Sequence, residues 1–205
     1  MPTGRRRSQS RDIQRRGFIH SYGLFWNADE INWFRDAETP DRFRVLGRQG
    51  KRGENLQVCD FRYQRGIYVL YDDYGAYYVG LTRVGTLGGR LKQHRRDRHA
   101  GKWGRFSWFG FAPVLQARPH ADGTLALGKV PPKLLTDSKW AIRDLEALLI
   151  QSIGTQHRGN TLQMRFGQGE HWEQVMSHET DHYLDRLEKP RPSRARKPPS
   201  RRTRP

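Results

Sequence analysis

The segment GIYVLYDDYGAYYVG, Gly66–Gly80, restricts the fold of this chain more than any other stretch of its sequence. The runs GIYVLY and AYYVGLT flank DDYG, and Asp and Gly are residues that suit tight turns. The segment therefore predicts a β-hairpin that continues to Thr82. Side chains alternate across each strand, which places Ile67, Val69 and Tyr71 on one face and Tyr68 and Leu70 on the other.

A helix and a strand are predicted directly after the hairpin. TLGGRLKQHRRDRH is typical of a helix capped by Thr86, with Leu87 and Leu91 on one stripe. Arg90 and His94 are four residues apart, so they share a different face of that helix. RFSWFGFAPVLQAR is aromatic on both alternating faces, which favours a strand that is buried on both sides.

A second helix is predicted for KWAIRDLEALLIQSI, with Ser138 as its cap. Glu146 lies one turn from both Ile142 and Ile150, at or inside the edge of the apolar stripe. A carboxylate there is costly unless it is paired or bound to a cation, whereas an edge glutamate that reaches water needs neither. The expected buried stripe consists of Ala141, Ile142, Leu145, Leu148 and Leu149.

The rest of the chain gives a coarser prediction. Residues 17–65 contain two strand-like runs, GFIHSYGLFW and LQVCDFRYQ, and a helix start at Asn27. We interpret them as an N-terminal extension packed on a domain formed by residues 66–188. Residues 117–137 are expected to form a loop, because PHADG and VPPK interrupt regular structure. The last ordered piece, through GEHWEQVMSHETDHYLDRLE, is expected to be helical.

Both ends of the chain are strongly basic. Residues 1–16 and 189–205 contribute +5 and +8 of the formal net charge of +17, which leaves +4 for the segment between them. Basic, Pro-rich ends without apolar spacing are typical of disordered arms. A polyanion is the natural partner of such arms, although an exposed tail without a partner has the same composition.

Other features limit the class of protein. A single cysteine, Cys59, excludes an intramolecular disulfide framework and any Cys-rich zinc site. No stretch of about 18 apolar residues exists, so we expect no membrane span. RRGFIHSYGLFW carries two arginines before an apolar run, but polar residues interrupt that run and NADE follows it. We therefore expect a cytoplasmic protein.

The order strand, turn, strand, helix, strand, helix carries GIY at residues 66–68 and YVG at 78–80. GGRLKQH, LEALLI and an asparagine follow in that order. Over residues 66–166 this pattern resembles the GIY-YIG nuclease superfamily. The resemblance implies an α/β (α+β) fold with a small three-stranded sheet flanked by helices. It also implies cleavage of DNA phosphodiester bonds with a divalent metal.

The resemblance assigns roles to particular residues. Tyr68 and Tyr78 match the two motif tyrosines, and Arg90 matches the arginine of the first helix. Glu146 matches the metal-binding glutamate. His94 matches a histidine found one turn after the arginine in some members, and His99 is a second position for such a histidine. Further support to the site or to nucleic acid is assigned to Asn160, Arg83 and Lys92.

Phosphodiester hydrolysis explains why these residue types are needed. It requires an activated water and positive charge beside the oxygens that become more negative. A single Mg²⁺ or Mn²⁺ ion prefers oxygen ligands, such as Glu146 and a substrate phosphate. Arg90 can bind phosphate through two N–H groups. Tyr78 is the candidate base, and Tyr68 either relays the proton or orients the water.

Three alternatives remain at this stage. HETDH, His178–His182, has the zinc-protease spacing, but only Asp185 and Glu188 follow it as ligands before the basic tail. A zinc-only structural role for it, together with His171, is a related alternative. The third is a nucleic-acid-binding module that keeps the fold without cutting. The sequence does not distinguish DNA from RNA as the substrate, and it does not determine the oligomeric state. Because one catalytic set makes one nick, a double-strand cut requires a homodimer or two successive binding events.

Overall fold

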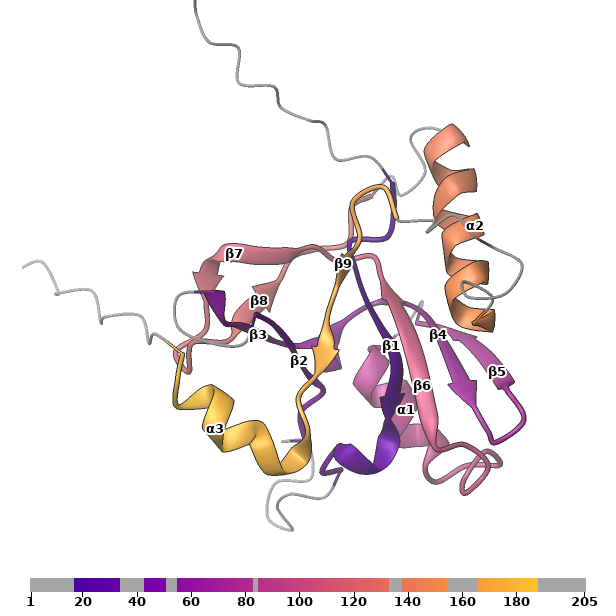
Figure 1. Ribbon diagram of the computed structural model, residues 1–205, viewed down its shortest axis with the longest axis horizontal. Coiled ribbons are helices and arrows are strands. Elements are labelled where there is room, and N and C mark those ends of the chain that lie inside the picture. Colours follow the sequence, from indigo (N-terminus) through magenta and orange to yellow (C-terminus); the bar gives the residue numbers. More distant parts are fainter. Residues whose placement is uncertain are drawn as a thin grey trace, which may run out of the picture.

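The computed structural model describes residues 17–33, 43–50, 55–82, 85–132, 138–154 and 166–187. They form two mixed five-stranded sheets with three α-helices around them (Figure 1). The prediction of a small three-stranded sheet is therefore wrong. The predicted hairpin and the first half of the third predicted strand, RFSWFGFAPVLQAR, do lie together in one sheet, and strands from before and after residues 66–166 enlarge it. The second half of the third predicted strand belongs to the second sheet instead.

Sheet A has the strand order β5-β4-β6-β1-β9. The hairpin strands β4 and β5 pair antiparallel, and Tyr68 faces Gly80 across them. Strand β6 pairs antiparallel with β4 and with β1, so the chain before the hairpin supplies an inner strand of the same sheet. Its five strands are β1 (Ser21–Asn27), β4 (Gly66–Tyr71), β5 (Ala76–Leu81), β6 (Arg105–Gly110) and β9 (Glu170–His171).

Sheet B has the strand order β10-β2-β3-β8-β7. Strand β3 pairs antiparallel with β2 and parallel with β8. Two of its strands fall inside or next to the segment expected to be a loop, which shows that the turn residues there separate short strands. The strands are β2 (Leu46–Gln49), β3 (Gln57–Asp60), β7 (Val114–Pro119), β8 (Leu125–Leu127) and β10 (Glu173–Gln174).

Only one of the predicted helices, the one that begins at Ser138, is observed over its full predicted length. The helix predicted at Asn27 is a single 3-10 turn, although the Asn27 side chain does accept a hydrogen bond from the Asp29 N–H group. The C-terminal piece has short strands before its helix. The α-helices are α1 (Leu87–His94), α2 (Ser138–Ile153) and α3 (Thr180–Leu184), and the 3-10 turns are η1 (Ala28–Glu30), η3 (Phe61–Tyr63) and η4 (Ser177–Glu179).

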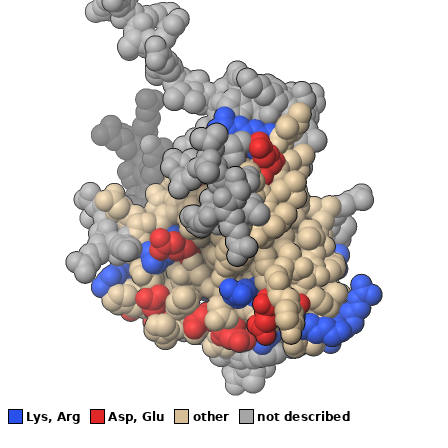
Figure 2. Space-filling view, turned by 45° about the vertical axis from the view of Figure 1, so that its right-hand side comes forward, with Lys and Arg blue, Asp and Glu red and all other residues tan. Residues whose placement is uncertain are grey.

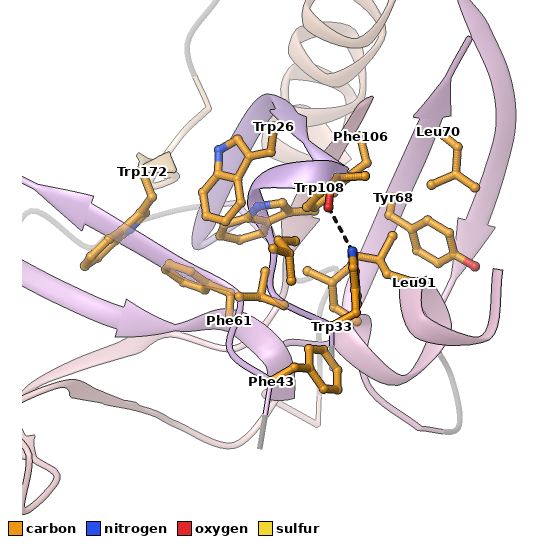
Figure 3. Packing of buried hydrophobic residues seen from close by; sticks show 14 of the residues in the cluster. Trp26, Trp33, Phe43, Phe61, Tyr68, Leu70, Leu91, Phe106, Trp108 and Trp172 are labelled. Carbon is orange, nitrogen blue, oxygen red and sulfur yellow. Dashed lines mark hydrogen bonds between the residues drawn. The ribbon is translucent and has the colours of Figure 1, made fainter. Parts of the chain in front are cut away.

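The largest core lies between the two sheets and includes α1. Its centre is aromatic: Trp108 from sheet A packs 4.3 Å from Phe61, measured between ring centroids, and Trp26 meets Trp108 edge to face. Tyr68 belongs to this cluster, but its hydroxyl points away from the tryptophans (Figure 3). The predicted Thr86 cap and the buried Leu87 and Leu91 of α1 are confirmed.

Helix α2 packs on the opposite face of sheet A. Ala147 and Leu148 join Val69, Tyr71 and Phe109 in a second cluster, which confirms the predicted alternation in β4. The predicted buried stripe of α2 is wrong in three of its members. Ile142, Leu145 and Leu149 are 65%, 47% and 56% exposed. The helix is therefore rotated relative to the prediction.

A third cluster covers the outer face of sheet B, where α3 contributes Tyr183 and the following turn contributes Leu187. The three clusters separate α2, sheet A, sheet B and α3 in that order, so α2 and α3 lie on the outside of the body (Figure 1). Within the described ranges, no helix is long and apolar enough to cross a membrane. The basic ends, residues 1–16 and 189–205, lie outside the described residues.

Candidate active site

Most of the predicted site residues meet at one end of α1. Strand β4 supplies Tyr68 and strand β5 supplies Tyr78, while His94 ends the helix and Arg90 lies one turn before it. The aromatic rings are close: the Tyr78 centroid lies 6.2 Å from that of Tyr68 and 5.2 Å from that of His94. Hairpin and helix thus bring together residues up to 26 positions apart.

A chain of hydrogen bonds links the buried tyrosine to a carboxylate. The Tyr68 hydroxyl lies 2.8 Å from His94 Nε2, and His94 Nδ1 lies 2.9 Å from Asp97 Oδ2. Because an ionised carboxylate can only accept hydrogen bonds, His94 donates one from Nδ1 to Asp97 and accepts one at Nε2 from the Tyr68 hydroxyl. The order Tyr68–His94–Asp97 can therefore move a proton from the phenol to the imidazole.

Asp97 is held in place by the turn that follows α1. Its other oxygen, Oδ1, accepts from the His99 backbone N–H at 2.9 Å. The His99 side chain then lies beside the rings of the site, with Nδ1 at 3.2 Å from the Tyr77 hydroxyl and its centroid 4.8 Å from that of His94. The turn therefore fixes Asp97 and His99 on the same side of His94.

The surroundings alter the acidity of three groups. Burial raises the pKa of Tyr68 well above its ordinary value; neighbouring Tyr78 adds to this rise and Arg90 opposes it. Burial alone would raise the pKa of Asp97, but hydrogen bonds from His99 and His94 lower it below the usual range. Burial also lowers the pKa of His99, and His94 contributes to that shift. At neutral pH the site holds a protonated phenol and an ionised carboxylate.

The second motif ends in a glycine, Gly80, because a larger residue at this position would collide with the Tyr68 side chain. A Cβ atom at this position would lie 2.2 Å from the Tyr68 hydroxyl oxygen and 2.1 Å from Tyr68 Cζ. Any larger residue would therefore push the buried ring out of its place beside His94. The glycine keeps the space that the Tyr68 side chain occupies.

Arg90 and Tyr78 are both half-buried. Arg90 donates from Nη1 to Gln93 Oε1 at 3.1 Å on the helix surface. Lys92, one position after Leu91, lies over the Phe43 ring. Of the two motif tyrosines, Tyr78 is the one that reaches solvent, because Tyr68 is only 1% exposed.

Three side chains of the site can hold a metal ion. One ligand atom each from His94, Asp97 and His99 lies within 4.8 Å of the other two, and both histidines are buried. Among the described residues, no other group of three such side chains is this close. The resemblance assigns the metal to Glu146, so the group of side chains that could hold an ion in the structure is a different one.

Glu146 is exposed on α2, on the other face of sheet A from Tyr68. The buried acid of that helix is Asp144, which accepts from the backbone N–H groups of Phe18, Ile19 and Gly167 at 2.8, 3.2 and 2.9 Å. The described structure therefore does not bring Glu146 together with the tyrosines. The buried carboxylate of α2, that of Asp144, instead stabilises the fold through these three hydrogen bonds.

The remaining candidates do not extend this site within the described residues. Asn160 and Arg83 lie outside the described residues. His178 and His182 of HETDH are both exposed, on η4 and α3, and within the described residues no third ligand joins them. Neither zinc hypothesis for this segment gains support from the structure.

Asp97 and Tyr77 were not predicted as site residues. Asp97 lies three positions after His94, a spacing that allows contact across a helix end, so the letters HRRD contained a signal for this pair. Tyr77 precedes Tyr78 and should point to the other face of a regular strand. The register of β4 and β5 shifts between Leu70 and Tyr71, which leaves Tyr77 as an extra residue of β5. This irregularity, together with the turn after α1, allows the contact of Tyr77 with His99.

Charge near the site is mixed. The first turn after α1 is rich in arginine, but Arg95 is paired with Asp29 at 3.2 Å. Figure 2, which shows one face of the molecule, has basic and acidic side chains close together along its lower part instead of one large patch of a single sign. The described body therefore contributes a modest share of the basic character.

Comparison with known protein families, curated proteins and solved structures found no match for this chain.

Proposed function

We propose that this protein is a metal-dependent endonuclease that hydrolyses DNA phosphodiester bonds at the α1 end of sheet A. The observation that carries the proposal is the hydrogen-bonded chain Tyr68–His94–Asp97 next to Tyr78 and Arg90. Its support is twofold: the pattern of residues resembles the GIY-YIG superfamily, and four of the residues so assigned share one site.

The chain gives the water-activating step a route for its proton. Tyr78 is half-buried and reaches solvent, so an attacking water can give its proton to the Tyr78 hydroxyl while Tyr78 passes its own proton to Tyr68. Tyr68 passes its own proton to His94 Nε2, and the ionised Asp97 stabilises the imidazolium that results. A buried phenol with a raised pKa would be a poor free phenolate, which is why Tyr68 is assigned to the relay.

Arg90 is assigned to the phosphate. Its guanidinium is always charged, it is half-buried, and it lies one helical turn before His94. In this position it can balance the negative charge that grows on the phosphate oxygens as the water attacks. The basic ends of the chain would add affinity for DNA of any sequence.

The divalent ion remains part of the proposal, as Mg²⁺ or Mn²⁺, which would polarise the phosphate. The described residues do not fit a site that joins Glu146 to the tyrosines, because the two lie on opposite faces of sheet A. No step is therefore derived through an ion at Glu146. His94, Asp97 and His99 could hold an ion beside the tyrosines, but they form the proton relay and their two imidazoles suit Mg²⁺ poorly, so the proposal does not place Mg²⁺ or Mn²⁺ on them.

The test is incubation of the full chain with supercoiled plasmid in Mg²⁺, Mn²⁺ or EDTA, followed by gel analysis. We expect nicked or linear product with metal and none with EDTA, and His94→Gln should bind DNA without cutting it. Glu146→Ala is assayed beside it: loss of cutting would return the metal-ligand role to Glu146, and retained cutting would assign the reaction to the α1 face alone.

The second candidate is a nucleic-acid-binding module that does not cut. The separation of Glu146 from Tyr68 favours it, because a binder has no need to gather all the assigned residues. Lack of cleavage of duplex, single-stranded and branched DNA, with binding intact in a gel-shift assay, would select this second function.

A further inference from the structure

We propose that His94, Asp97 and His99 form a binding site for a transition-metal ion of the Zn²⁺ type, and that this ion and the Tyr68–His94–Asp97 hydrogen-bond chain exclude each other. The proposal concerns binding alone. It does not depend on DNA cleavage, and either can fail without the other.

The ligands are held before any ion arrives. His94 ends α1, and Asp97 and His99 follow in the turn, where the His99 backbone N–H fixes the Asp97 carboxylate. The two histidine side chains are buried, so their rings lose little freedom on binding. Zinc ligand atoms at about 2.0–2.2 Å from the ion lie roughly 3.5 Å apart, so small ring rotations close a group that spans 4.8 Å.

The donor set selects the class of ion. Two imidazoles and one carboxylate suit Zn²⁺ and its neighbours Co²⁺ and Ni²⁺, whereas Mg²⁺ prefers oxygen ligands in an octahedron. Three protein ligands leave a fourth position for water, as in open zinc sites. His99 has a partner at each ring nitrogen, the Tyr77 hydroxyl at 3.2 Å from Nδ1 and Arg98 Nε at 3.3 Å from Nε2, so an ion bound to His99 would replace one of these hydrogen bonds.

Both nitrogens of His94 already have partners, and this makes the two states exclusive. An ion at Nδ1 would replace the proton that His94 gives to Asp97, so the remaining ring proton would sit on Nε2 and face Tyr68. An ion at Nε2 would displace the Tyr68 hydroxyl itself. In either arrangement Tyr68 can no longer pass its proton to His94.

The first experiment is calorimetric titration of the full chain with Zn²⁺, with Mg²⁺ as the comparison ion. We expect one Zn²⁺ site that Mg²⁺ at the same concentrations does not fill, with at least a tenfold loss of affinity in His99→Gln and in Asp97→Asn. Tyr68→Phe should bind Zn²⁺ at least as tightly as the natural chain, because it removes the competing hydrogen bond.

The matched control is the double variant His178→Gln/His182→Gln, which removes the other pair of histidines with zinc spacing. It should bind Zn²⁺ like the natural chain. The proposal is overturned if this control loses the site, or if His99→Gln and Asp97→Asn both keep full affinity.

A measurement on the unaltered chain covers the case in which a variant does not fold. Long-range ¹H–¹⁵N correlation spectra of the imidazoles report which ring nitrogen carries the proton. We expect Zn²⁺ to shift the signals of His94 and His99 and to change the His94 tautomer or displace its Tyr68 partner. Unchanged His94 and His99 signals at saturating Zn²⁺ would refute the site.

Discussion

Helices α1 and α2 lie on opposite faces of sheet A, and they differ in how well their sequence predicts which side chains they bury. Helix α1 has eight residues, is mostly polar, and buries the leucines that its pattern predicts. Helix α2 has sixteen residues and is rich in leucine and isoleucine, yet it exposes Ile142, Leu145 and Leu149. The comparison shows that an apolar stripe fixes the rotation of a helix only where no buried polar group competes with it.

Asp144 is that competing group in α2. Its carboxylate satisfies three backbone N–H groups at the start of the described chain and before β9. Hydrogen bonds to a charged acceptor are stronger than neutral ones, and leaving buried donors unpaired is costly. Burying Asp144 therefore turns Ala147 and Leu148 to the sheet, and the isoleucine and leucine side of the helix outward.

The largest expected effect is the loss of this anchor. Asp144→Ala should lower the free energy of unfolding by about 3–5 kcal/mol, because three buried donors lose a charged acceptor. Glu146→Ala, two residues away and exposed, should change it by less than about 0.5 kcal/mol. Urea unfolding of both variants checks this, and Asp144→Asn is the milder variant if the alanine protein does not fold. Equal effects at the two positions would disprove the rotation of α2.

Two neighbouring leucines sharpen the same comparison. Leu148 is 7% exposed and Leu149 is 56% exposed. Leu148→Ala should cost about 2–4 kcal/mol of stability, because it leaves a cavity against sheet A, while Leu149→Ala should cost less than about 0.5 kcal/mol. Thermal or urea unfolding gives both values. The reverse order would mean that α2 packs as its stripe predicts.

On the α1 face, the corresponding test is Gly80→Ala. The added Cβ would overlap the Tyr68 ring, so we expect a loss of about 1–3 kcal/mol and displacement of the tyrosine from His94. Gly104→Ala is the control, since a Cβ there has nothing within 4 Å and the backbone is ordinary. Gly80→Ala with unchanged stability would show that Tyr68 is not held as described.

The smallest effect concerns pH. The pKa of Asp97 is lower in the folded chain than its ordinary 3.8, so the folded state is favoured wherever the carboxylate is ionised. This contribution is complete above about pH 5 and is lost as the pH falls through the lowered pKa. Asp97→Asn should therefore flatten the decline of stability below pH 4, as measured by urea midpoints from pH 5 to pH 2.5. An equally steep decline in the variant would show that Asp97 is not stabilised by its neighbours.

Sequence reasoning succeeded where local patterns decide. Residues a few positions apart decide three features that were predicted correctly. These are the alternation of side chains in β4, the Thr86 cap, and the shared helix face of Arg90 and His94 on α1. It failed where distant segments meet. Strand β1 enters sheet A beside β6, and Asp144 binds the N-terminal segment 125 and 126 positions away. The metal-ligand role of Glu146 rests on the family resemblance. Its place beside an apolar stripe gives no burial, because that stripe faces outward in the structure.

The central claim is that the hydrogen-bonded tyrosine on the α1 face belongs to a site of phosphodiester hydrolysis. The most direct test is the single-turnover rate of plasmid nicking by Tyr68→Phe at saturating metal and DNA. The matched control is Tyr74→Phe, a tyrosine of the same hairpin that is 99% exposed. We predict a rate lowered roughly 10²–10⁴-fold for Tyr68→Phe with DNA binding intact, and no change for Tyr74→Phe. A Tyr68→Phe protein that nicks DNA as fast as the natural chain would contradict the account.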